Sequence, residues 1–136
     1  MTDIRRVVPN VQVPEGEKSR DCRDPQDSQD SLEANRDFYG TLGFEQVMHQ
    51  GWIMTMASPT HPTAQVSFLT HDATAPVVPD LSVELGDVTE VDAAYEAFRS
   101  AGAEIVHALR DEEWGVRRFF VRDPQGRVVN VLAHRP

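Results

Sequence analysis

Apolar and polar residues alternate in several short stretches of the first half of the chain. A valine-rich run covers residues 7–13, and further alternating runs cover 44–49, 52–57 and 64–69, with prolines and glycines between them. Alternation with a period of two over four to eight residues is typical of half-buried β-strands. The first half is therefore predicted to hold four strands.

A helical pattern joins the first two of these strands. Apolar positions recur from Leu32 to Leu42, Asp30 or Ser31 is suited to cap the start, and Gly43 is suited to end the helix. The stretch 14–31 before this pattern carries acids, serines and glutamines but almost nothing apolar. Such a composition buries little surface, so this stretch is predicted to be a solvated loop or a disordered insert.

The second half repeats the same order of elements after a proline-containing loop. A helix is predicted to open at 87–89 and to end at Gly102. Strands are predicted over 81–85, 104–107, 116–122 and 127–133, and the last two flank the turn sequence Asp-Pro-Gln-Gly at 123–126.

The two halves also resemble each other residue by residue. The sequence FYGTLGFEQV at 38–47 aligns with AFRSAGAEIV at 97–106, and Gly51-Trp52 aligns with Gly115-Val116. The prediction is an α+β fold of two βαβββ modules in a single domain covering 1–136. Module 1 is expected at about 5–70 with the polar insert 14–31, and module 2 at about 78–135.

Composition and charge exclude several classes of function. The chain has 136 residues, 22 acids against 13 bases and a formal net charge of −9. Nucleic-acid binding and docking to an anionic membrane both require a basic face, so neither is expected. No apolar run is long enough to span a bilayer and no signal sequence opens the chain, and the lone Cys22 fits a reducing compartment. A cytoplasmic location is therefore expected.

Tandem motifs give the chain a family resemblance. The first module carries Phe38-Tyr39 and Leu42-Gly43-Phe44, and the second carries Ala101-Gly102-Ala103 and the run Phe120 to Gly126 that contains Asp-Pro-Gln-Gly. In this the chain resembles the vicinal oxygen chelate superfamily, which includes glyoxalase I, ring-cleaving dioxygenases and bleomycin resistance proteins. The resemblance implies two βαβββ modules that form an open, cupped, barrel-like mixed sheet with helices on its outer face.

Enzymes of that superfamily hold a divalent metal through four inward strand positions. The resemblance places these positions at Val8, Ser67, Val78 and Asn130. Valine has no donor atom, and serine and asparagine are poor substitutes for histidine and glutamate at a divalent site. We therefore expect no metal, no cofactor and no catalytic residue, as the resemblance to the metal-free bleomycin resistance branch implies.

Side chains alternate between the two faces of a strand, so residues two positions from the matched ones also face the cup. Pairing of the last two strands across Pro124 and Gln125 adds Arg117, Phe119 and Val121 to that face. The opposite positions are uniformly apolar and are predicted to pack under the helices. The candidate ligand-binding residues are Asn10, Trp52, Gln65, Ser67, Asp80, Trp114, Arg117, Phe119 and Asn130.

Each candidate has a structural alternative. The polar face is either a ligand site or a solvated sheet face. Trp52 and Trp114 either stack on a flat ligand or pack at a dimer contact. Arg117 either binds a ligand anion or pairs with Glu112 or Glu113. Asp80 acts either as a base or as a structural carboxylate.

The function predicted is metal-independent binding of an aromatic or amphipathic small molecule in the cup. The alternative is a metal-dependent lyase, isomerase or dioxygenase of the same superfamily, although the five histidines show no metal-binding spacing. A third possibility is a protein that has lost its ligand and serves only as a dimeric partner. A homodimer is expected, because exposed sheet edges invite pairing, and the alternative is a monomer whose own two modules close the cup.

Overall fold

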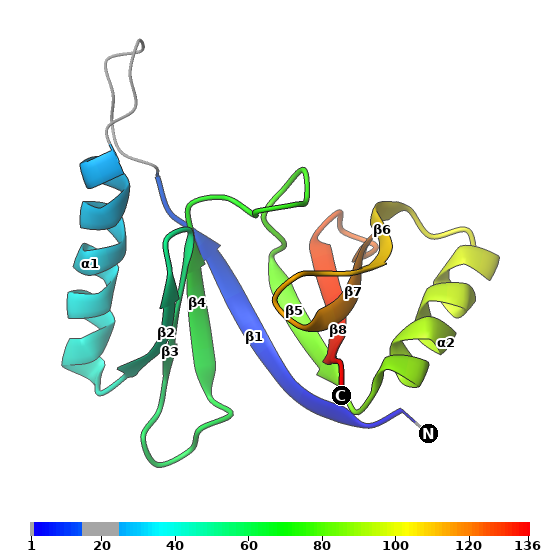
Figure 1. Cartoon of the computed structure of the whole chain (residues 1–136), viewed down its shortest axis with the longest axis horizontal. Coiled ribbons are helices and arrows are strands. Elements are labelled where there is room, and N and C mark those ends of the chain that lie inside the picture. The colour runs from blue at the N-terminus through cyan, green and yellow to red at the C-terminus, as the bar shows by residue number, and fades with distance from the viewer. Residues whose placement is uncertain (1, 15–24) are drawn as a thin grey trace, which may run out of the picture. The chain divides into compact units, whose positions relative to one another are not determined.

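The structure is a computed structural model that describes residues 2–14 and 25–136. Its elements are β1 (Ile4–Gln12), α1 (Pro25–Leu42), β2 (Glu45–Gln50), β3 (Ile53–Ala57), β4 (Gln65–Leu69), β5 (Leu81–Leu85), α2 (Val88–Ser100), β6 (Ile105–Asp111), β7 (Val116–Arg122) and β8 (Val128–His134) (Figure 1). This order is βαβββ twice, so the predicted α+β repeat is confirmed. No helix among the described residues has both the length and the apolarity to cross a membrane.

The chain divides into two compact units. The first-repeat unit is Pro9–Val78, and the second-repeat unit is Pro79–Pro136 together with the chain up to Val8. The division follows the two repeats except within β1, whose first half is grouped with the second repeat. Each unit has its own helix and its own core.

In the first-repeat unit the hydrogen-bonded strand order is β2-β3-β4-β1. The β3–β4 pair is antiparallel and the β4–β1 pair is parallel, with Val11 opposite Phe68. Helix α1 covers one face, because the apolar members of the alternating pattern gather there. This core contains Val13, Leu32, Met54, Met56, Val66 and Phe68, with Tyr39 and Phe44 packed against it.

In the second-repeat unit the order is β5-β8-β7-β6, with a parallel β5–β8 pair and antiparallel pairs beyond it. Helix α2 covers one face through Val91, which is fully buried. The buried core residues are Leu85, Val91, Phe119, Val121, Val131 and Ala133. The valines predicted to lie under the helices do so at Val83, Val129 and Val131.

Local signals set most helix ends. Asp87 caps α2, with its side chain accepting a hydrogen bond from the Glu90 backbone N–H, and Gly102 follows the end of that helix with a φ of 80°. Gly43 has a φ of 114° after α1, where Phe44 N donates to Tyr39 O at 3.2 Å. This left-handed conformation is accessible to glycine at little cost, so both predicted glycine ends are confirmed.

The start of α1 differs from the prediction. The helix begins at Pro25, so residues 25–31, which were expected to be irregular, are helical. Proline is favourable at the first position of a helix, where its missing N–H leaves no hydrogen bond unmade. The remaining part of the predicted insert, residues 15–24, lies outside the described residues.

The register of β7 against β8 also differs from the prediction. Arg118 lies opposite Leu132 and Phe120 opposite Asn130, one residue away from the expected pairing. Gly126 has a φ of 89°, and Asp123 N donates to Arg127 O at 2.8 Å. The turn therefore contains one more residue than a two-residue hairpin, and a slip of one residue exchanges the two faces of a strand.

Candidate ligand-binding site

Each unit has an open face, which we define as the sheet face opposite its helix. In the second-repeat unit Phe119 marks the helix side, because its ring centroid lies 5.0 Å from that of Tyr95 on α2. Phe120 therefore projects from the open face. The strand register places Ser82, Asn130, Phe120 and His107 side by side across β5, β8, β7 and β6 on this face.

The register corrects two predicted ligand-binding residues. Phe119 is fully buried in the core under α2 and does not reach the open face. Arg117 also lies on the helix side, where its Nε donates to Asp92 Oδ1 of α2 at 2.7 Å and its Nη1 donates to Asp111 Oδ1 at 3.0 Å. These bonds, first that to Asp92, raise the pKa of Arg117. The predicted partners Glu112 and Glu113 were also wrong.

A buried group of charges occupies the open face instead. Glu112 is fully buried, and its Oε2 accepts a 2.7 Å hydrogen bond from Arg118 Nε and lies 3.1 Å from His107 Nε2. Arg110 Nε lies 3.0 Å from Glu112 Oε1. We call Glu112, Arg118, His107 and Arg110 the Glu112 cluster. Burial of Glu112 and Arg118 is tolerated because their opposite charges neutralise each other, whereas Arg110 is 49% exposed.

Two aromatic rings lie close to the guanidinium of Arg118. Its Cζ atom lies 5.0 Å from the Trp114 ring centroid and 4.8 Å from that of Phe120. The ring centroid of His107 lies 5.0 Å from that of Phe120. Cations at these distances from aromatic faces are attracted by the ring quadrupole. Trp114, a predicted ligand-binding residue, thus adjoins the Glu112 cluster.

Asn130 lies beside this cluster with one half of its amide unused. The side chain is 7% exposed, and its Nδ2 donates to Ser82 Oγ at 3.0 Å. Its Oδ1 is buried and has no hydrogen-bond partner among the described residues. A buried acceptor without a donor costs free energy, and in native proteins such groups commonly serve a ligand or a water molecule.

Asp80 and Gln65 have local structural contacts. Asp80 is exposed, its Oδ2 accepts a 2.7 Å hydrogen bond from Val128 N, and its own N donates to Val128 O at 2.7 Å. This carboxylate therefore extends the β5–β8 pairing, as in the structural alternative considered for it. Gln65 Nε2 donates to Pro62 O at 2.9 Å in the preceding loop.

The open face of the first-repeat unit carries amide and hydroxyl groups at its centre. Asn10 lies opposite Ser67, and the buried hydroxyls of Ser67 and Thr55 are 2.7 Å apart. Trp52 directly precedes β3, and its ring centroid lies 6.1 Å from that of His71. These contacts place three predicted residues, Asn10, Ser67 and Trp52, beside polar and aromatic side chains of the first-repeat unit.

The residues present do not fit a divalent metal. Among the positions that the family resemblance assigns, Val8 and Val78 have no donor, and Ser67 and Asn130 offer only neutral oxygens. The register adds Asn10 beside Ser67 and Ser82 beside Asn130, which are again amides and hydroxyls. Within the described part of the chain, no three His, Cys, Asp or Glu side chains are grouped to hold a metal ion. The function proposed below therefore involves no metal ion.

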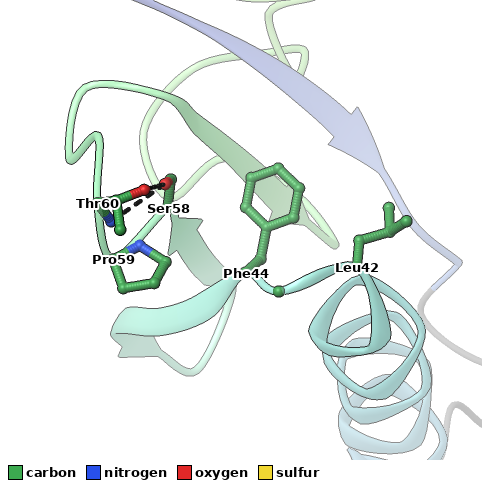
Figure 2. Close-up of a pocket in the computed structure, with 6 residues that line it drawn as sticks. Leu42, Phe44, Ser58, Pro59 and Thr60 are labelled. Atoms are coloured by element: carbon green, nitrogen blue, oxygen red, sulfur yellow. Dashed lines mark hydrogen bonds between the residues drawn. The ribbon is translucent and has the colours of Figure 1, made fainter.

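A pocket of about 270 Å³ lies away from these residues (Figure 2). It is formed by the connection between α1 and β2 and by the loop that follows β3. The residues that line it are Leu42, Gly43, Phe44, Ser58, Pro59 and Thr60. Its polar atoms are already used locally, since Ser58 Oγ accepts hydrogen bonds from the backbone N–H groups of Thr60 and His61. This pocket contains none of the predicted ligand-binding residues and no ionisable group.

Sequence reasoning missed Arg118, Glu112 and His107. Gly126 was the sequence signal that could have placed Arg118 on the open face. Glycine after Asp-Pro-Gln is typical of a three-residue turn, which shifts the β7–β8 register by one residue. Nothing local marks Glu112, which lies in the loop between β6 and β7 and is buried only by its neighbours in space.

Comparisons with solved structures show a shared fold. A glyoxalase/bleomycin resistance protein/dioxygenase superfamily member from Vibrio splendidus 12B01 is 18% identical with a TM-score of 0.58, over 96% of this chain and 98% of that one. The Mn(II)-bound glyoxalase from Novosphingobium aromaticivorans is 16% identical with a TM-score of 0.61, over 98% of this chain and 40% of that one. An NAD-dependent benzaldehyde dehydrogenase from Legionella pneumophila is 13% identical with a TM-score of 0.64, over 95% and 97%.

At these identities the likeness extends to the fold alone, and no significant match is found among curated proteins. The family model of the Glyoxalase/Bleomycin resistance protein/Dioxygenase superfamily, however, matches residues 29–131. That span begins in α1 and ends in β8, so it contains most of both repeats. The chain therefore belongs to the glyoxalase/bleomycin resistance protein/dioxygenase superfamily.

Proposed function

We propose that this chain binds a small organic molecule on the open face of its sheet without the help of a metal ion. The observation that carries the proposal is Asn130, whose Oδ1 is buried and lacks a donor among the described residues. A ligand N–H or O–H would supply that donor. Phe120, opposite Asn130 in the register, is fully buried and makes the surroundings of that amide apolar.

The donor chemistry favours binding over metal-dependent catalysis. Ser67 and Asn130 are the only family metal positions with a polar side chain, and both are neutral. A metal-dependent lyase, isomerase or dioxygenase needs ligands that neutralise a divalent charge, which amides and hydroxyls do poorly. The neutral donors are suited to hydrogen bonding with an organic molecule.

Metal analysis and a ligand screen test this proposal together. Protein purified without a chelator is expected to contain far less than one equivalent of any transition metal. A thermal-shift screen of planar aromatic compounds is expected to find stabilising ligands for the wild type, and Asn130→Leu is expected to lose them. Ser58→Ala, in the unrelated pocket, is the matched control. A tightly bound stoichiometric metal, or an unchanged response in Asn130→Leu, would overturn the proposal.

We also propose that the chain forms a homodimer. Strand β2 is the outer strand of the first-repeat unit, and its Val47 is 58% exposed. An open strand edge with apolar side chains favours pairing with another copy. Sedimentation equilibrium at low micromolar concentration is expected to give about twice the chain mass of 15.2 kDa. A mass equal to that of one chain would refute the dimer.

A further inference from the structure

We propose that two copies of this chain meet through an apolar patch on helix α1, where the Phe38 ring of each copy enters a pocket beside Leu42 of the other. We define the α1 patch as Ala34, Phe38 and Leu42 together with the pocket of about 270 Å³ that Leu42 helps to line. This inference rests on the proposed homodimer and names the surface and the anchoring side chain of its contact. It is independent of ligand binding on the open faces.

Helix α1 carries apolar residues on two sides. One side faces the core of the first-repeat unit, where Leu32 is 1% exposed and Tyr39 packs against the buried residues. On the other side the three residues of the α1 patch follow one another at intervals of four, so they form one stripe along the helix. A surface helix is normally polar on the side away from the core, so a second apolar stripe indicates a second covering surface.

The stripe is largely exposed in the single chain. Among the described residues, Leu42 at 70% and Phe38 at 64% are the most exposed large hydrophobic side chains. They are one helical turn apart, so their exposed surfaces adjoin. Single exposed apolar side chains are common, but adjoining ones mark a surface that contacts another molecule.

The ring of Phe38 is held in place before any contact is made. Its centroid lies 5.0 Å from that of Tyr39 in an edge-to-face arrangement, and the Tyr39 ring in turn lies 5.0 Å from the fully buried Phe68. A ring that is already ordered loses little conformational entropy when a partner covers it. This property suits Phe38 to be the anchoring residue of an interface.

The pocket supplies a cavity on the same surface. Figure 2 shows Phe44 between Leu42 and the loop 58–60, and all of these residues line it. Its volume lies below the roughly 300–1,000 Å³ of pockets that hold drug-sized molecules, so a side chain is a better match for it. A twofold contact presents the same surface twice, so a projecting side chain must meet a cavity on that surface. The α1 patch contains both, which favours a second copy as its partner.

The charges around the stripe also favour a second copy. Residues 34–42 contain one cation and one anion, Arg36 and Asp37, whose side chains are 42% and 74% exposed. The whole chain has a formal net charge of −9, so its copies repel each other over most orientations. A surface with one charge of each sign avoids this repulsion and is complementary to itself across a twofold axis.

The α1 patch is continuous with the strand edge of the proposed homodimer. Helix α1 passes into β2 through Gly43 and Phe44, which both line the pocket. The β2–β3 register shifts between Gln46 and Met48, and Val47 is left out of the pairing. Such a bulge interrupts a strand edge and limits the length over which a second copy extends the sheet. Packing of the α1 patch is therefore expected to supply most of the contact.

Sedimentation equilibrium on the full chain tests the anchor. Phe38→Ala and Leu42→Glu are each expected to raise the dimer dissociation constant at least about thirtyfold, the effect typical of an anchoring residue. Ile4→Glu is the matched control, because Ile4 is 60% exposed and belongs to the second-repeat unit. It is expected to keep the wild-type dissociation constant.

A further variant tests the pocket from its other side. Thr60→Trp places a large side chain in an exposed loop residue that lines the pocket, and it is expected to weaken the dimer although the α1 stripe is intact. Circular dichroism is expected to show wild-type secondary structure in every variant, because the substituted side chains are exposed. A weakened dimer is then attributable to the surface and not to loss of the fold.

The outcomes separate this inference from the homodimer itself. If the wild type is a dimer and Phe38→Ala and Leu42→Glu keep its dissociation constant, the α1 patch is refuted as the contact and the homodimer stands. If the wild type has the mass of one chain, the homodimer and this inference fail together. If that single chain binds an apolar dye and Leu42→Glu does not, a partner other than a second copy uses the surface.

Discussion

Removal of the Glu112 carboxylate should be the most damaging change on the open face. The variant is Glu112→Leu, which preserves much of the side-chain volume. Glu112 is fully buried and accepts a 2.7 Å hydrogen bond from Arg118, which is 4% exposed and cannot become solvated without a rearrangement of β7. The variant therefore leaves a guanidinium charge buried without the Glu112 carboxylate.

The magnitude follows from the burial of each cation. Breaking a buried ion pair by removing one partner costs about 3–5 kcal/mol. Arg110 is 49% exposed, so water replaces most of its interaction and it adds only about 0–1 kcal/mol. The predicted loss for Glu112→Leu is thus about 4 kcal/mol, a large part of the roughly 5–15 kcal/mol that stabilises a small domain.

Urea unfolding followed by circular dichroism measures this loss. With a slope of about 2 kcal/mol per molar urea, the midpoint should fall by roughly 2 M. In the double variant Arg118→Met with Glu112→Leu both charges are absent, and its stability should return to within about 1.5 kcal/mol of the wild type, because apolar replacements of a buried pair are often neutral.

Two results would refute this reasoning. If Glu112→Leu costs less than about 1 kcal/mol, Arg118 has enough access to water to remain solvated without its partner. If the double variant loses the sum of the two single losses, the two side chains are not coupled, and the short contact between them has no energetic meaning.

Further predictions test the register, the turn, the helix cap and the insert. Phe119→Ala should cost about 3–5 kcal/mol because Phe119 is buried under α2, whereas Arg117→Met should cost only about 1 kcal/mol or less, both measured by urea unfolding. Gly126→Ala should destabilise by about 1–2 kcal/mol, because Gly126 has a φ of 89°. The hydrogen bond from Thr89, and then that from Glu90 N, hold the pKa of Asp87 below 3.8 in the folded protein. The stability that Asp87 contributes is therefore present above pH 3.8 and is lost as the pH falls through its folded pKa. Asp87→Asn should weaken the dependence of the free energy of unfolding on pH between about pH 5 and 2. Deletion of residues 15–24 should leave the melting temperature nearly unchanged, and a loss above about 2 kcal/mol would contradict the predicted solvated insert.

Much of the fold could be predicted from the sequence because its signals are local. Gly43 and Gly102 end helices because the left-handed backbone there is cheap for glycine, and Asp87 starts one because its side chain accepts a hydrogen bond from the first turn. The alternation that placed Val66 in the core under α1 depends only on the period of a strand.

The candidate site was predicted less completely, for two physical reasons. Whether Arg117 or Arg118 lies on the open face depends on a single extra residue in the turn at Gly126, since a one-residue slip in register exchanges the faces of the strand. Asn130 was assigned correctly to the open face, but its missing hydrogen-bond partner emerges only when every nearby donor is placed in space.

By itself, the sequence determined the two repeats, the helix ends at Gly43 and Gly102, the start of the second helix and the residue types at the matched metal positions, because each of these depends on residue type and spacing along the chain. Only the tertiary structure decided that Glu112, a loop residue with no motif around it, is buried against Arg118 and His107. Burial of a charge depends on what surrounds it in three dimensions, and the partners of Glu112 come from two strands whose register is set by turns and not by periodicity.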